Sequence, residues 1–139
     1  MTSVNILEIV AILLLLINHS NTLLCKEKAT PSVGDLCLEQ NKTLQGDVPL
    51  LLVYYTDSLD QPPKWGTICD DQVDGTALTT MCQQLGYDDT KYRYIWGYND
   101  VDPWFSEVTC GSQTTQNILR CPFIRANNPN CSKIYLHWI

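Results

Sequence analysis

The stretch Trp65-Gly-Thr-Ile-Cys-Asp-Asp71 joins a short run of strand-forming residues to a cysteine and two adjacent acids. A longer run rich in strand formers, Val48-Pro-Leu-Leu-Leu-Val-Tyr-Tyr55, precedes it along the chain. Residues 56–63, between the two runs, contain the polar residues and prolines that favour turns. The two runs are therefore predicted to be strands joined by a loop.

One helix is predicted after this stretch, over residues 76–85. Its apolar positions recur at the spacing of one helix face: Leu78, Met81, Cys82 and Leu85. Asp74 or Thr76 can cap the first turn, and Gly86 can adopt the left-handed conformation that ends a helix. The same spacing predicts that Cys82 points into the core.

The carboxyl end of the chain is predicted to be a closing strand. Apolar residues alternate there with Tyr135 and His137: Ile134, Leu136 and Trp138. This period of two is typical of a half-buried strand. No second helix is predicted between Gly86 and the closing strand, because turn dipeptides recur throughout that region.

The amino terminus carries nine consecutive apolar residues, Ile9–Ile17, followed by polar ones. This run suits the core of a signal peptide and is shorter than the ~20 residues that cross a bilayer. Either Ser20 or Cys25 could end the peptide. Residues 1–25 are predicted to be a cleaved signal peptide, residues 26–35 a linker, and residues 36–139 one folded domain. In the alternative, the segment stays uncut and associates the chain with a membrane.

Seven cysteines in 139 residues favour an oxidising compartment. Cleavage after Cys25 would leave an even set: Cys37, Cys69, Cys82, Cys110, Cys121 and Cys131. An even number in a secreted chain indicates a disulfide framework, although spacing alone does not choose the pairs.

The charge is unevenly distributed along the chain. Residues 26–107 hold 14 acids and 6 bases, whereas residues 108–139 hold no acid and three bases, Arg120, Arg125 and Lys133. The formal net charge of −6 and the absence of a basic run argue against sequence-specific nucleic-acid binding. The three bases are a candidate site for an extracellular polyanion. The alternative is that they are scattered over a solvated surface.

Three motifs together resemble the scavenger receptor cysteine-rich domain family over about residues 36–139. They are Trp65–Asp71, Met81-Cys-Gln-Gln-Leu-Gly86 and Trp104-Phe-Ser-Glu-Val-Thr-Cys-Gly111. The resemblance implies a small, disulfide-rich α+β fold in which a curved antiparallel sheet cradles one helix. It also implies extracellular binding without catalysis.

The resemblance further implies the disulfides Cys110–Cys121 and Cys69–Cys131. The third bridge of the family joins the helix cysteine, here Cys82, to a final strand that has no cysteine in this chain. The expected replacement is Cys37–Cys82, because folds of the family lay the closing strand beside the opening strand, and the opening strand here would run through Cys37. In the alternative, Cys82 is a small buried side chain, and a one-residue change of register would turn Cys37 to the other face.

Asp70 and Asp71 match the paired acids that help many members of the family to hold calcium. Two adjacent carboxylates suit Ca²⁺, which takes six to eight oxygen ligands. The loop 111–120, which supplies a further ligand in the family, has no carboxylate here. Calcium is therefore expected to bind weakly at most, and the alternative is an acidic turn that is solvated or paired with a base.

Three further features bear on function. Asn41-Lys-Thr43 is an acceptor sequon, so a glycan is predicted on Asn41. An aromatic row, Tyr92, Tyr94, Trp96 and Tyr98, could pack inside the domain or stack on sugar rings. Asp70 and Glu107 could form a glycosidase-like carboxylate pair, but the chain has no nucleophile elbow or C-x-x-C motif.

Together these features predict a secreted, non-catalytic recognition module of the scavenger receptor type that binds anionic glycans or proteins. The first alternative is a membrane-anchored receptor ectodomain or a fragment of one. A small secreted hydrolase is a remote alternative.

Overall fold

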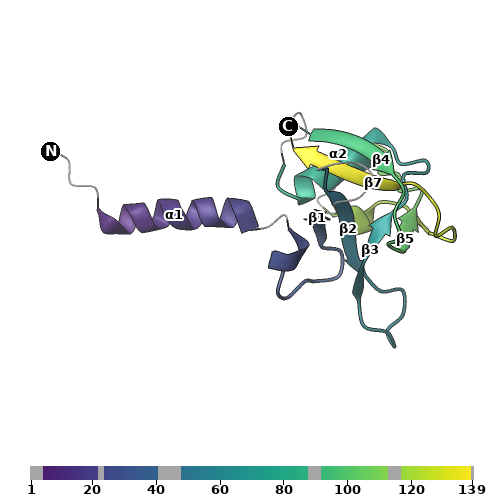
Figure 1. The fold of residues 1–139 in the computed structure, drawn as a ribbon, viewed down its shortest axis with the longest axis horizontal. Coiled ribbons are helices and arrows are strands. Elements are labelled where there is room, and N and C mark those ends of the chain that lie inside the picture. The colour runs from purple at the N-terminus through teal and green to yellow at the C-terminus, as the bar shows by residue number, and fades with distance from the viewer. Residues whose placement is uncertain (1–4, 22–23, 41–47, 88–91, 113–116, 139) are drawn as a thin grey trace.

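The computed structural model describes residues 5–21, 24–40, 48–87, 92–112 and 117–138 (Figure 1). The helices are α1 (Ile6–Asn21) and α2 (Gly75–Gln84), with short 3₁₀ turns η1 (Cys25–Glu27) and η2 (Ile118–Arg120). The strands are β1 (Leu36–Glu39), β2 (Leu50–Tyr55), β3 (Lys64–Ile68), β4 (Tyr92–Gly97), β5 (Pro103–Ser106), β6 (Ile124–Arg125) and β7 (Lys133–Trp138). Asn41 and residues 113–116 of the expected calcium loop lie outside the described residues.

The strands form one sheet in the order β4-β7-β2-β3-β5-β6, with β1 paired to β2. The predicted pair of strands around residues 56–63 is β2 and β3, which run antiparallel. The α+β class is confirmed, but the expectation of a purely antiparallel sheet is corrected, because β3 and β5 run parallel. The chain passes through α2 and β4 between these two strands, and such a long connection can return a strand in the same direction.

The predicted helix is α2, which packs on one face of the sheet. Asp74 caps it, because its side chain accepts a hydrogen bond from the backbone N–H of Ala77 at 2.8 Å. Met81, Cys82 and Leu85 are buried as their spacing predicts. They belong to the helix-side cluster, whose buried members also include Leu36, Leu38, Leu51, Val53, Ile68, Phe105, Ile134 and Leu136.

The opposite face of the sheet carries a smaller far-side cluster of four buried residues: Cys37, Leu50, Leu52 and Tyr135. Cys25, Trp65 and Ile95 pack around it as partly buried neighbours. Strands β1, β2 and β7 each divide their side chains between the two clusters, as the alternation of a strand requires.

Two of the expected disulfides are present in the structure, and the third expected pair is not. The structure joins Cys69 to Cys131 and Cys110 to Cys121, the pairs that the resemblance implies. It joins Cys37 to Cys25, so the expected pair Cys37–Cys82 is wrong. The reason is the strand alternation: Cys37 faces the far-side cluster, whereas Cys82 lies in the helix-side cluster. The closing strand β7 also pairs with β4 and β2, and not with the opening strand β1.

Two contacts involve the segment before β1, where residues 26–35 are expected to form a linker. Leu24 forms a parallel bridge with Leu38, and the Lys28 ammonium lies 3.6 Å from the Asp35 carboxylate. Helix α1, which contains the apolar run, stands apart from the sheet (Figure 1). In the part of the chain that the structure describes, no helix is both long and apolar enough to span a membrane.

Candidate functional site

A groove of roughly 430 Å³ lies where β3, β5 and the segments around residues 101–102 and 125–129 meet. Aromatic, charged and amide side chains line it: Lys64, Trp65, Asp102, Trp104, Arg125 and Asn127. The parallel pairing of β3 with β5 brings Lys64 and Trp104 together, although 40 residues separate them in the chain. The groove is therefore a product of the tertiary fold.

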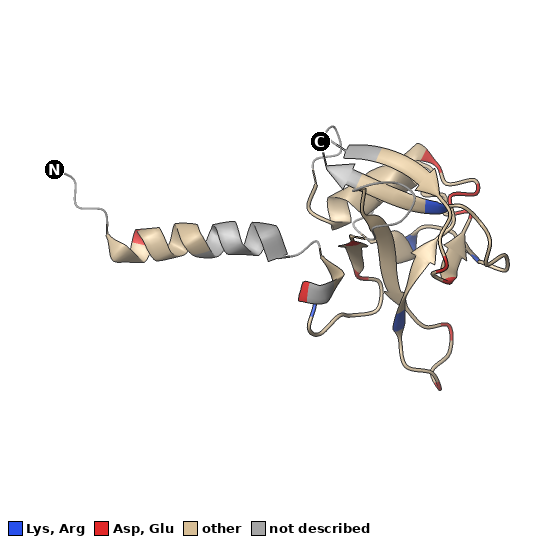
Figure 2. Ribbon diagram, viewed as in Figure 1, with Lys and Arg blue, Asp and Glu red and all other residues tan. Residues whose placement is uncertain are grey.

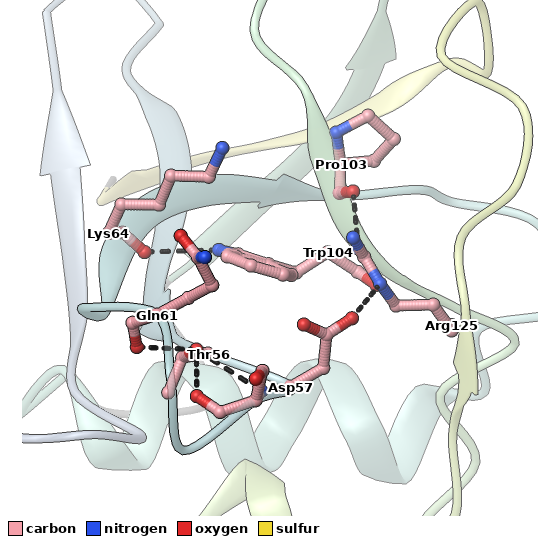
Figure 3. A network of polar contacts seen from close by, with 8 residues as sticks. Thr56, Asp57, Gln61, Lys64, Pro103, Trp104 and Arg125 are labelled. Atoms are coloured by element: carbon pink, nitrogen blue, oxygen red, sulfur yellow. Dashed lines mark hydrogen bonds and ion pairs between the residues drawn. The ribbon is translucent and has the colours of Figure 1, made fainter.

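Trp104 is 6% exposed, and the cationic side chains of Lys64 and Arg125 both contact its ring. Its indole N–H donates to the backbone oxygen of Lys64 at 3.0 Å (Figure 3). A Cβ atom at Gly66 would come within 2.5 Å of the Trp104 ring, so only glycine allows this close approach. The ring is thus fixed by β3 on one side.

Arg125 fixes the ring from the other side. Its guanidinium carbon lies 4.3 Å from the centroid of the Trp104 ring, within the range of a cation–π contact. Its Nε donates to the Asp57 carboxylate at 2.8 Å, and one terminal nitrogen donates to the backbone oxygens of Pro103 and Trp104 (Figure 3). Arg125 is held in place by these contacts while half of its side chain stays exposed.

Lys64 supplies the second cation, with its ammonium 5.6 Å from the same ring. It is exposed, and no ion pair joins it to another described residue. Asp102 also lines the groove, and Asp57 partly neutralises Arg125. The groove therefore presents two cations to an anionic substituent, while Asp57 and Asp102 reduce its net positive charge.

The predicted basic trio does not form one surface. Arg120 is exposed at the end of η2, and Arg125 lies in the groove. Lys133, expected to meet a polyanion, is fully buried, and its ammonium donates to the backbone oxygens of Asn99 and Pro129 at 3.0 and 2.7 Å. The described Lys and Arg residues lie on separate elements (Figure 2). The expectation of a polyanion-binding role is therefore corrected for Lys133.

The buried ammonium of Lys133 is held by two backbone oxygens. Burial lowers the pKa of its ammonium below the ordinary value of 10.5, although the nearby carboxylates of Asp100 and Asp102 act in the opposite direction. The two carbonyl acceptors, Asn99 and Pro129, lie in two loops that are far apart in the sequence. Lys133 therefore acts as an internal cation that ties these segments together.

The first of the expected calcium ligands, Asp70, is already engaged by hydroxyl groups. Its carboxylate accepts hydrogen bonds from the Tyr94 hydroxyl at 3.1 Å and from the Ser132 hydroxyl. Burial, followed by the charge of Asp70 and this hydrogen bond, raises the pKa of Tyr94. Asp71 is exposed on the following turn.

These contacts fit a calcium ion poorly. Both oxygens of the Asp70 carboxylate accept hydroxyl donors. Among the residues that the structure describes, no three His, Cys, Asp or Glu side chains are placed to share a metal ion. Calcium binding at Asp70 and Asp71 stays a prediction. A calcium ion would compete with the Tyr94 and Ser132 hydroxyl groups for the Asp70 carboxylate.

The other expected site features divide between the interior and the surface. Trp96 and Tyr98 are 55% and 57% exposed and pack edge to face, whereas Tyr94 is partly buried against the helix-side cluster. The Glu107 backbone N–H donates to the Asp71 backbone oxygen at 3.0 Å, which places the two acidic turns side by side.

Sequence reasoning missed Lys64, Asp57 and Gly66 as parts of the groove. Trp104 is expected from the resemblance to be a packing residue, and its burial agrees with that interpretation. A glycine inside a predicted strand is one indication that another group approaches the backbone closely. Nothing in the local sequence, however, indicates that the approaching group is the Trp104 ring.

Comparisons with known proteins place the chain in a family. The family model described as scavenger receptor cysteine-rich domain matches residues 39–138. The chain is 32% identical over 79 residues to the macrophage receptor MARCO of Mus musculus, a match that covers 57% of this chain and 14% of that receptor. The receptor of the same name from Mesocricetus auratus is 32% identical over 68 residues, covering 49% of this chain and 14% of that receptor.

The chain therefore matches only a small part, 14%, of the length of these curated relatives. Among solved structures, the dimeric form of the SRCR domain of mouse MARCO aligns with a TM-score of 0.46 and 21% identity. That alignment covers 81% of this chain and 99% of that domain. Because the family model matches most of its length, this chain belongs to the scavenger receptor cysteine-rich domain family.

Proposed function

We propose that this protein is a non-catalytic extracellular recognition module that binds an anionic group of a glycan or protein in the groove beside Trp104. The observation that carries the proposal is the pair of cations, Lys64 and Arg125, on the ring of one tryptophan. Because Trp104 is 6% exposed, its ring orients the two cations, and the cations suit a sugar or peptide that carries a sulfate or carboxylate.

The contacts of Arg125 support this proposal. Because Asp57 and two backbone oxygens already orient the guanidinium, little side-chain freedom remains to be lost on binding. Lys64 is exposed and can approach an anion without breaking a described ion pair. Asn127 and the partly buried Trp65 add an amide and a second ring to the lining.

Secretion is the location we propose, with membrane attachment of a longer receptor as the alternative. The apolar run Ile9–Ile17 and the three disulfides support an extracellular setting. The relatives are named as macrophage receptors and are much longer than this chain, which favours the alternative of a receptor ectodomain or fragment. A protein recovered from medium carrying a glycan on Asn41 would support secretion.

The ligand is tested with dextran sulfate, a sulfated polymer, and with neutral dextran as its uncharged counterpart. We expect the wild-type protein to bind the sulfated polymer only, and binding to weaken as salt is added, because exposed charges are screened within about 8 Å at physiological ionic strength. Lys64→Ala should weaken binding by roughly tenfold, the effect of losing one charged hydrogen bond.

Arg120→Ala is the matched control, because it removes one exposed charge outside the groove. It should leave binding nearly unchanged. Equal losses for Lys64→Ala and Arg120→Ala would contradict the groove and would indicate that net charge alone governs binding. The same titration with calcium and with a chelator tests the prediction for Asp70 and Asp71.

A further inference from the structure

Leu24 and Cys25 belong to the folded domain. Cys25 forms a disulfide with Cys37, and the two Cα atoms are 4.9 Å apart. Leu24 pairs with Leu38 of β1 through a backbone bridge, and Cys25 packs against the far-side cluster. The amino-terminal segment is therefore tied to the sheet before β1 begins.

Cys25 is the cysteine that lies beside Cys37 on the same face of the sheet. Cys37 is fully buried on the far side of β1. Four other cysteines are committed to their own bridges: Cys69, Cys131, Cys110 and Cys121. Cys82 lies in the cluster on the opposite face. A cut after Cys25 would leave Cys37 with no cysteine on its own face of the sheet among the described residues.

Helix α1, which precedes Leu24, differs from this segment because it exposes apolar side chains. The first turns of α1 expose large apolar side chains, including Ile6 at 76% and Leu7 at 75%. Such a row of exposed apolar side chains is unusual in a finished soluble domain and is typical of a segment that meets another apolar environment. The boundary between the two kinds of segment therefore lies between the apolar run Ile9–Ile17 and Leu24.

We infer that the mature protein is produced by a proteolytic cut after Ile17 and before Leu24, so that Cys25 stays in the domain. The cut hydrolyses one peptide bond and consumes one water molecule. The Cys25 and Cys37 thiols then lose two protons and two electrons to a disulfide oxidant, such as oxidised glutathione, and form the bridge. This inference does not rest on the ligand groove.

The test is to secrete the full chain from a eukaryotic cell line and to map the unreduced, alkylated protein by mass spectrometry. The expected result is a mature amino terminus between Asn18 and Leu24, with a Cys25 peptide linked to a Cys37 peptide. A mature chain that begins at Lys26 or later, or that keeps Met1, would overturn the inference.

Cys25→Ala separates the cut from the bridge. The variant should have the same amino terminus as the wild type, because the cut precedes residue 25, whereas Cys37 should become reactive to alkylation after unfolding. A changed amino terminus in Cys25→Ala would place residue 25 in the recognition sequence of the peptidase and would contradict the inference. If this variant is retained in the cell, the wild-type map still decides.

Discussion

The two faces of the sheet are stabilised in different ways. The helix-side cluster is a broad apolar core to which α2 and most of the strands contribute. The far-side cluster has only four buried residues and is closed by the Cys25–Cys37 bridge at its edge. A small face cannot bury much apolar area, so a covalent link contributes a larger share of its stability. The same strands therefore contribute to a broad core that also contains the Cys110–Cys121 bridge on one side, and to a small cluster beside the Cys25–Cys37 bridge on the other.

The largest effect is expected on the helix side. Phe105 is fully buried and lies 4.7 Å from Tyr55 and 4.1 Å from Phe123, measured between ring centroids. Phe105→Ala should lower the free energy of unfolding by about 3–5 kcal/mol, because it removes buried surface and leaves a cavity. Urea unfolding measures the change. Ile124→Ala, at a side chain that is 49% exposed, is the control and should change little.

The next effect compares a bridge on each face. Cys25–Cys37 and Cys110–Cys121 close loops of nearly equal length, with sequence separations of 12 and 11. The chain-entropy model therefore predicts a similar loss for each double alanine variant, about 3 kcal/mol.

Thermal or urea unfolding of the two double alanine variants shows whether the two faces of the sheet unfold together or separately. Equal losses would mean that both bridges act on the unfolded chain. A much smaller loss for Cys25→Ala with Cys37→Ala would mean that the far-side segment detaches without unfolding the helix side, and would contradict one cooperative unit.

A smaller effect is expected at the rim where β3 meets β5. Gly66→Ala would place a methyl group 2.5 Å from the Trp104 ring, so the ring must move. We expect a loss of about 1–3 kcal/mol, the usual cost of overpacking, together with weaker binding in the groove. Tryptophan fluorescence and urea unfolding measure the two consequences. Gly75→Ala is the matched control, because an added Cβ there meets no atom within 4 Å.

The smallest effect concerns Asp74, which joins α2 to the Cys110–Cys121 loop. Its carboxylate accepts from the backbone N–H groups of Ala77, Cys110 and Gly111. Burial opposes ionisation, but these three donors outweigh it and lower the pKa of Asp74 below its ordinary value of 3.8. Asp74→Ala should cost about 1 kcal/mol at neutral pH, as the loss of a helix cap does.

The sign of the pH dependence follows from the lowered pKa. The contribution of ionised Asp74 is fully present above pH 3.8 and is lost as the pH falls through the lower value of the folded state. The stability difference between the wild type and Asp74→Asn should therefore narrow below pH 3.8. A difference that stays constant across that range would show that the charge of Asp74 contributes nothing.

Several elements of the fold follow from local patterns in the sequence. The helix face of Met81, Cys82 and Leu85, the cap at Asp74 and the strands on both sides of residues 56–63 follow from spacing and turn chemistry, which act over a few residues. The resemblance of three motifs was enough to indicate the family. Tertiary structure alone decided which face Cys37 occupies, because strand alternation changes sides with each residue and short strands fix the register only through their partners.

Tertiary structure also decided the roles of the cations. Lys133 and Arg125 look alike in the sequence, but β7 carries Lys133 inside, where two backbone oxygens satisfy its ammonium, and β6 places Arg125 on the Trp104 ring. The groove itself depends on the parallel pairing of β3 and β5, which joins Lys64 to a tryptophan 40 residues away. A side chain's charge is a local property of the sequence, whereas its burial and its partners depend on contacts between segments far apart in the chain.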